Sequence, residues 1–140
     1  MAKIEIRRLD PGDASVLDRV AEDVFDYSIK KARVAAYLRE PGHLLFVAIH
    51  ESEVVGQARG VIHFHPDMED ELYIGNLGVR PALRRQGIGT KLIEALLAAG
   101  KEHGCREAWV GTEADNDTAR KFYESLGGKD APTVFFTLKL

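Results

Sequence analysis

Residues 84–90, Arg84-Arg85-Gln86-Gly87-Ile88-Gly89-Thr90, join a strand pattern to a helix pattern and decide the architecture around them. The apolar run from Leu72 to Val79 precedes them, and apolar residues recur at helical spacing from Gly87 onward. The first N–H groups of a helix and the positive end of its dipole attract anions, and glycine lets a phosphate approach the backbone. The stretch therefore predicts an anion-binding turn suited to a di- or triphosphate.

The charges around this turn favour the same prediction. From Leu72 to Ile93 the chain has no acidic residue, although its formal net charge is -3. Four cations lie in that interval: Arg80, Arg84, Arg85 and Lys91. A chain that is acidic overall lacks the broad basic surface that nucleic acids need, so we expect no nucleic-acid partner. The P-loop motif is absent, and Leu92 replaces the third glycine of a Rossmann fingerprint.

Turn signals and hydrophobic periodicity divide the rest of the chain into further elements. Strands are expected near 4–6 and at 43–50, 54–65, 72–79, 106–112 and 134–140, and helices at 16–24, 30–39, 87–103 and 117–126. The order is β-α-α-β-β-β-α-β-α-β, an α/β (α+β) arrangement in which a meander is followed by a crossover helix and a parallel pair. With 140 residues and no linker or repeat, residues 1–140 are expected to form a single domain.

The composition is that of an ordinary globular protein, with 45% hydrophobic and 29% charged residues. No window approaches the ~18 apolar residues that span a bilayer, so no membrane association is expected. The N-terminal charges do not fit a secretion signal, and the lone Cys105 cannot form an internal disulfide. These features predict a cytoplasmic protein, with Cys105 as a small core residue at the start of a strand.

A second motif lies near the C-terminus, from Asn116 to Gly127. Asn116 and Tyr123 are seven residues apart, about two helical turns, so they face the same side of the helix expected there. Tyrosine retains its proton at neutral pH, since its reference pKa is about 10, yet it can act as a general acid. The motif thus places an amide side chain and a hydroxyl group that can donate a proton on the same side of one helix.

Together the two motifs resemble the signatures of the GNAT N-acetyltransferases. Arg84, Gly87 and Gly89 fit the pattern Q/R-x-x-G-x-G/A, and residues 116–127 are similar to N-x-x-A-x-x-F-Y-x-x-x-G. The resemblance covers almost the whole chain. It implies a mixed, mostly antiparallel sheet with a central splayed parallel pair, acetyl-CoA as cosubstrate, and no metal. A narrower similarity, to the small aminoglycoside 3-N-acetyltransferase-like branch, rests on residues 71–74 and 84–88.

The resemblance also implies a role for each matching residue. The asparagine holds the pantetheine arm and the tyrosine protonates the departing thiolate, although Gly128 stands where an aromatic residue usually follows. A bulge is expected near Leu77 and Gly78, where a glycine inside a strand pattern independently suggests one. The Leu77 N–H would polarise the thioester carbonyl, and the Val79 backbone would pair with pantetheine. The full cofactor-binding set is Leu77, Gly78, Val79, Arg84, Arg85, Gln86, Gly87, Ile88, Gly89, Thr90, Asn116 and Tyr123.

The group that deprotonates the acceptor amine is less obvious. Related aminoglycoside enzymes carry a carboxylate just before the bulge, where this chain has Asn76, and an amide cannot act as a base. The remaining candidates are Glu71, Glu113 and, through a water, Tyr73. The predicted catalytic residues are therefore Tyr123, the Leu77 backbone, Glu113 and Glu71.

His63 and His65 share a strand face and precede a run of acidic residues, so a metal site has to be considered. We expect none, because carboxylates in a mobile loop lack a fixed ligand geometry. The acidic residues fit a surface that attracts a polycationic amine better. They are Asp67, Glu69, Asp70 and Glu71, together with Glu22, Asp23 and Asp26.

The sequence thus predicts an N-acetyltransferase that moves an acetyl group from acetyl-CoA to a primary amine by direct attack in a ternary complex. The acceptor is expected to be a small molecule, with an aminoglycoside-like amine as one candidate. Acetylation of a protein lysine or N-terminus is an alternative, and so is a non-catalytic acyl-CoA-binding regulatory module. The sequence leaves the oligomeric state open, a homodimer included, since fold and cofactor site do not define partners.

Overall fold

The computed structural model describes residues 3–140, whose contacts divide the chain into two compact units. The first unit is Met1–Val110 and the second is Gly111–Leu140. The expectation that residues 1–140 act as one domain stays a prediction. None of the helices within residues 3–140 is long and apolar enough to cross a membrane.

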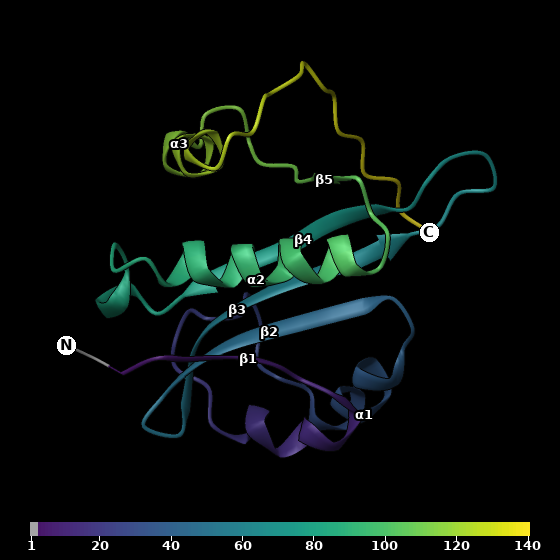
Figure 1. The fold of residues 1–140 in the computed structure, drawn as a ribbon. Helices are drawn as coiled ribbons and strands as arrows, with labels where there is room; N and C mark the ends of the chain where they lie inside the picture. Colours follow the sequence, from purple (N-terminus) through teal and green to yellow (C-terminus); the bar gives the residue numbers. More distant parts are fainter. Residues whose placement is uncertain (1–2) are drawn as a thin grey trace. The chain divides into compact units, whose positions relative to one another are not determined.

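The first unit is built on a five-stranded sheet with the strand order β1-β2-β3-β4-β5 (Figure 1). Its elements are β1 (Glu5–Arg8), η1 (Pro11–Asp18), α1 (Lys31–Arg39), β2 (His43–His50), β3 (Glu53–His63), β4 (Glu71–Val79), η2 (Pro81–Leu83), α2 (Ile88–Glu102) and β5 (Glu107–Trp109). Neighbouring strands are antiparallel except for β4 and β5, which run parallel. The mixed, mostly antiparallel sheet expected from the sequence is confirmed.

Helix α2 packs on one face of this sheet through its apolar stripe, in which Leu92, Ile93 and Leu96 are fully buried. Glycines allow the close approach: a Cβ on Gly60 or Gly100 would lie 2.9 Å from leucine side chains of the same layer. Each such contact is tighter than packed carbon atoms tolerate, so a side chain at either position would force these leucine side chains to repack between helix and sheet.

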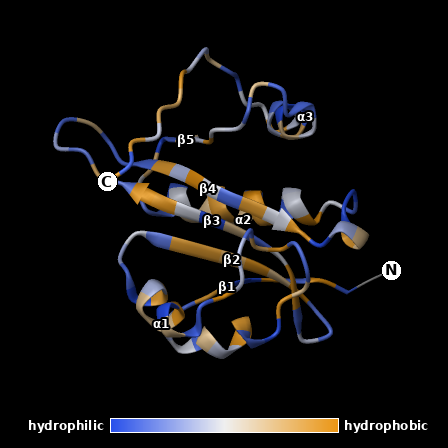
Figure 2. Cartoon of the chain, turned by 180° about the vertical axis from the view of Figure 1, so that it is seen from behind, coloured by the Kyte–Doolittle hydropathy of each residue, from blue (hydrophilic) through white to orange (hydrophobic). Residues whose placement is uncertain are grey.

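A second cluster of buried residues joins the N-terminal segment to the sheet. It consists of Leu9, Leu17, Val24, Val34, Leu38, Leu45, Val47 and Val54. Figure 2 shows the hydrophobic colouring of the central strands on which these layers rest. Because strand side chains alternate between faces, the long apolar runs of β2 and β3 supply both clusters at once.

The expected helix at 16–24 is replaced by the 3₁₀ helix Pro11–Asp18 and an irregular segment. Just after η1, the Val54 N–H donates to the Arg19 carbonyl, and the Ala21 N–H donates to the Val54 carbonyl, both at 2.9 Å. These bonds draw residues 19–21 into a short parallel bridge with β3. The backbone of residues 19–21 therefore forms its hydrogen bonds with the sheet rather than within a helix.

The second unit contains α3 (Asp117–Ser125), which matches the predicted helix. Residues 134–140, expected to be a strand, form no strand in the structure. A strand needs a neighbour that pairs with its backbone, and the described residues of this unit contain no other strand. The alternating apolar pattern of this segment therefore lacks a partner within its own unit.

Candidate active site

Strand β4 changes its pairing in the middle. Asn76 pairs with Arg59 whereas Ile74 pairs with Gly60, so Gly75 is the extra, bulged residue. The bulge therefore lies at Gly75, two residues before the expected position at Leu77 and Gly78. The parallel ladder with β5 covers only Glu71–Tyr73, which is why β5 is three residues long rather than Arg106–Thr112. Beyond the ladder, β4 continues to Val79 whereas β5 ends at Trp109.

The backbone direction of β4 after the bulge follows from one hydrogen bond. The Arg80 N–H donates to the Val55 carbonyl of β3 at 2.8 Å. In an antiparallel pair the N–H groups point alternately toward and away from the partner strand, so those of Leu77 and Val79 point to the outer edge. Within residues 3–140 no strand pairs with that part of the edge. The N–H groups of Leu77 and Val79 on this edge are therefore not paired with a strand, and these are two of the positions that the sequence predicts to bind the cofactor.

The turn at 84–90 has the backbone geometry of an anion site. Gly87 is the N-cap of α2 with a φ of 80°, and Arg85 has a φ of 64°, so both adopt the left-handed conformation. No side chain caps this helix in the described part of the chain. The N–H groups of Ile88, Gly89 and Thr90 therefore remain available at the positive end of the helix.

The cations near the turn divide into two pairs. Arg84 Nε donates to the Val79 carbonyl at 3.0 Å, which ties the turn to the end of β4. Arg80 Nη1 lies 3.4 Å from the Glu53 carboxylate. Arg85 and Lys91 form no ion pair with any residue between 3 and 140. These two charges are left to neutralise a bound anion, together with that of Arg84, whose Nε meets only a neutral carbonyl.

A short chain of polar groups reaches β4 from Val24, a member of the second cluster of buried residues. The Gln57 side chain is completely buried, and its Nε2 donates to the Val24 carbonyl at 3.1 Å and to Asn76 Oδ1. Asn76 Nδ2 then donates to Asp26 Oδ2 at 3.1 Å. Asp26 is exposed, so a carboxylate lies at the surface beside the residue that precedes Leu77. Sequence reasoning noted Asp26 only as one of several acidic residues and did not single out Gln57.

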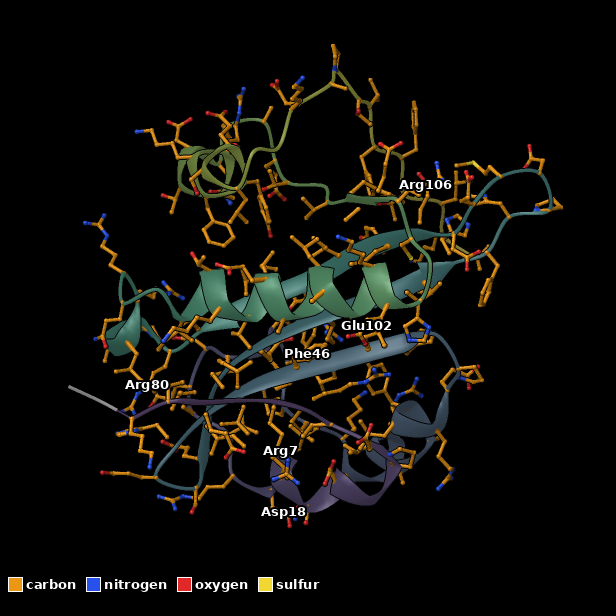
Figure 3. All side chains as sticks on the ribbon, viewed as in Figure 1. Arg7, Asp18, Phe46, Arg80, Glu102 and Arg106 are labelled. Carbon is orange, nitrogen blue, oxygen red and sulfur yellow. The ribbon has the colours of Figure 1, made fainter. Side chains whose placement is uncertain are left out.

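Glu71 lies at the other end of β4. Its Oε1 is 2.8 Å from His65 Nε2, and His63 joins them, so that one ligand atom from each residue lies within 4.8 Å of the others. Glu71 precedes Leu77 by six residues, which is about 20 Å along a strand. In Figure 3 the labelled Arg80, just after the end of β4, and Arg106, just before β5, lie toward opposite ends of the sheet. Arg106 Nε lies 3.7 Å from Glu69.

In the second unit Asn116 is the N-cap of α3. Its Oδ1 accepts a hydrogen bond from the Ala119 N–H at 3.0 Å, which leaves its Nδ2 group to donate to a ligand. Burial raises the pKa of Tyr123, seven residues further along the same helix. Glu113 is exposed just before this helix, where its carbonyl accepts from the Asn116 N–H at 3.0 Å. The unit thus holds both residues of the second motif on one helix.

Comparison with known proteins shows the family to which this chain belongs. Residues 11–128 match the model of the acetyltransferase (GNAT) family, so the chain belongs to that family. An uncharacterized N-acetyltransferase of Mycobacterium tuberculosis is 28% identical over 113 residues, which are 81% of this chain and 70% of the relative. N-alpha-acetyltransferase 30 of Xenopus laevis is 33% identical over 115 residues, 81% of this chain but 41% of its own length.

Solved structures agree with the fold. An aminoglycoside acetyltransferase from an uncultured soil metagenomic sample, in complex with trehalose, superimposes with a TM-score of 0.80 at 27% identity and 97% coverage of both chains. The aminoglycoside N-acetyltransferase AAC(6')-Iy, solved with a CoA bisubstrate analogue, gives 0.81 at 22% identity and 99% coverage of both. This protein is an acyl-CoA-dependent N-acetyltransferase that uses acetyl-CoA as cosubstrate and needs no metal.

Proposed function

We propose that this enzyme acetylates a primary amine of a small polycationic molecule, of the aminoglycoside kind, by direct attack in a ternary complex. One observation carries the proposal: two segments of opposite charge meet β4 where its outer edge is free. The turn at 84–90 is cationic, whereas the segment from Glu22 to Asp26 is acidic and contacts β4 through Asn76. Acetyl-CoA and a cationic acceptor suit these two segments respectively.

The roles of the cofactor-binding residues follow from their chemistry. The N–H groups at 88–90 bind the pyrophosphate, while Gln86, Arg85 and Lys91 lie within reach of its charge. The Val79 backbone and the Asn116 side chain hold the pantetheine arm. The Leu77 N–H donates to the thioester oxygen as it becomes an oxyanion, a contribution of about 3 kcal/mol in comparable sites. The second-unit residues enter this account on the strength of the family motif.

The reaction balances without a covalent enzyme intermediate. An amine nitrogen that has lost its extra proton attacks the thioester carbon, an N–C bond forms, and the C–S bond breaks. The ammonium group gives up two protons in all, and Tyr123 supplies one proton to the CoA thiolate. Once Tyr123 has been reprotonated, one proton is released for each acetyl group transferred.

Of the three sequence candidates for the base, Glu113 remains in the proposal, as the acceptor of one of the two protons that the ammonium group gives up. Glu71 is held by His65 and lies about 20 Å along β4 from Leu77, so we assign it to long-range attraction of the acceptor. The Tyr73 ring packs against Trp109, with a centroid distance of 4.4 Å, near the same end of β4. These positions favour binding roles over proton transfer for both residues.

Acetylation of a protein N-terminus is the second candidate, because N-alpha-acetyltransferase 30 is among the relatives. The aminoglycoside enzyme from soil is matched over 97% of its chain, which favours the small-molecule acceptor. The two are separated by measuring kcat/KM for neamine, sisomicin and spermine against a peptide with a free N-terminus and a peptide with only an internal lysine. We expect the first three to be preferred at least tenfold. A preference for either peptide would overturn the proposal.

A further inference from the structure

We infer that Asp26 supplies the carboxylate that receives the acceptor's ammonium group, in place of the one missing from β4. The inference rests on the proposed function and deepens it. The chain has Asn76 where related aminoglycoside enzymes were expected to carry a carboxylate. Asp26, fifty residues earlier in the sequence, brings its Oδ2 to 3.1 Å from Asn76 Nδ2. A carboxylate is thus restored across space, next to the strand position that precedes Leu77.

The hydrogen bonds around Asn76 have a fixed direction. The Val24 carbonyl can only accept, so Gln57 must turn its NH₂ group toward it. The same NH₂ group meets Asn76, which must therefore present its oxygen to Gln57. The Asn76 NH₂ group is then left for Asp26, which has to accept. The Val24 carbonyl thereby fixes the orientation of both side-chain amides, and the Asn76 NH₂ group donates to the Asp26 carboxylate.

Burying the polar side chain of Gln57 is energetically unfavourable, and the hydrogen-bond network explains why a polar residue lies at this position. Gln57 is completely buried in β3, and its Oε1 has no hydrogen-bond partner within the described residues. A buried polar atom without a partner is unfavourable, and an apolar residue would avoid the penalty. The benefit is that both NH₂ hydrogens are committed, one to the Val24 carbonyl and one to Asn76. Gln57 and Asn76 are positioning residues, whereas Asp26 is exposed and can touch the acceptor.

The position of Asp26 suits one step of the reaction. Its carboxylate binds the ammonium group of the acceptor and accepts the proton that this group must lose before the nitrogen can attack. The proton then passes to water, since the carboxylate is exposed. The thioester oxygen meanwhile faces the Leu77 N–H at the adjoining edge of β4. Proton removal and oxyanion stabilisation thereby take place beside two neighbouring positions of β4, Asn76, which holds Asp26, and Leu77.

An exchange of the two side chains tests the inference. In Asp26→Asn/Asn76→Asp the carboxylate moves to position 76, where it accepts from Gln57 and from the new amide at 26, so the direction of the network is kept. With acetyl-CoA and neamine we expect Asp26→Asn to lower kcat/KM by about a hundredfold, mostly through kcat, while acetyl-CoA affinity is unchanged. The exchange variant should recover at least tenfold of that loss.

Asp18→Asn is the matched control, because it removes an exposed acid that precedes the acidic segment from Glu22 to Asp26 and whose carboxylate lies 3.8 Å from Lys31 Nζ rather than against β4. Its kcat/KM should stay within about twofold of the parent. Two results would overturn the inference: Asp26→Asn as active as the parent, or an exchange variant that folds and binds acetyl-CoA but is no better than Asp26→Asn. A parent enzyme that releases no CoA with any amine of the panel would instead contradict the proposed function.

Discussion

Gly78 of β4 lies directly against the backbone of Val24: a Cβ at Gly78 would be 2.0 Å from the Val24 carbonyl oxygen. No side chain fits in that space, and the obstructing atom belongs to the backbone, so it cannot rotate away. The close approach carries the segment ending at Asp26 onto the strand. Gly78, predicted as a cofactor-binding residue, is thus placed where it positions the acceptor side of the site.

Gly78→Ala should therefore push the 24–26 segment away from β4. We expect the variant to lose about 1–3 kcal/mol of unfolding free energy in urea titrations, the usual cost of overpacking. Its KM for neamine should rise as Asp26 moves. Gly75→Ala is the control, since a Cβ there would meet Tyr73 Cε2 at 3.6 Å and the Arg59 carbonyl oxygen at 3.9 Å, both ordinary contacts. Equal stability of the two variants would refute the packing argument.

Tyr123 is expected to act as an acid over an unusually wide pH range. Burial raises its pKa, so the hydroxyl group keeps its proton through neutral and mildly alkaline conditions. In the parent, kcat should decline only above about pH 10, where the proton is lost. Tyr123→Phe should lower kcat by roughly 10²- to 10⁴-fold and abolish that alkaline decline.

The comparison for this variant is Tyr37→Phe, because burial also raises the pKa of Tyr37 in the first unit. This second variant should retain the parental kcat and its pH profile. Should Tyr123→Phe turn over at the parental rate, solvent or another residue must protonate the thiolate.

The two pairs of cations near the turn should respond differently to neutralisation. Arg85→Gln removes a charge that has no ion-pair partner within residues 3–140, so it should weaken acetyl-CoA binding by about fivefold to tenfold, ~1–1.4 kcal/mol. Arg80→Gln removes a charge already paired with Glu53 and should change the affinity by less than about twofold. Calorimetry at two salt concentrations measures both, and the Arg85 effect should shrink as salt screens it. Identical affinities for the two variants would contradict this assignment.

Asp13 links stability to pH at the start of η1. A hydrogen bond from the Asp10 N–H, and the nearby Arg7 guanidinium, hold the pKa of Asp13 below its ordinary value. The carboxylate therefore stabilises the fold at neutral pH, and this contribution is lost as the pH falls through the lowered pKa. Asp13→Asn should melt below the parent at neutral pH, and the difference should narrow below about pH 4. A gap in melting temperature that is constant with pH would exclude this carboxylate as the cause.

The order of the elements could largely be predicted from the sequence, because local patterns determine most of them. The boundaries of β2 and of α1 follow from apolar runs and from the Pro41-Gly42 break, and the observed ranges agree closely. Residues 16–24 also carry helical spacing, yet two backbone hydrogen bonds override it: the Val54 N–H donates to the Arg19 carbonyl, and the Ala21 N–H donates to the Val54 carbonyl. A pairing across more than thirty residues leaves no local mark in a sequence.

The candidate site also has parts that could be predicted from the sequence and a part that could not. The anion turn and the helix with Asn116 and Tyr123 are contiguous motifs and could be found by their spacing. The contact between Asp26 and Asn76 is fifty residues apart in the chain and depends on Gln57, a polar residue in an apolar strand. In the sequence the signal for this contact is Gln57 itself, a polar residue in an apolar strand. Its role depends on its partners Val24 and Asn76, which only the structure identifies.

The most direct test is to incubate the enzyme with acetyl-CoA and neamine and then determine, by mass spectrometry, where the acetyl group resides. The account predicts neamine acetylated on a primary amine nitrogen, one CoA released per acetylated product, and an enzyme of unchanged mass both with and without the acceptor. An acetyl group found on the protein in the absence of neamine, or CoA release without an acetylated amine, would contradict direct transfer to a cationic acceptor.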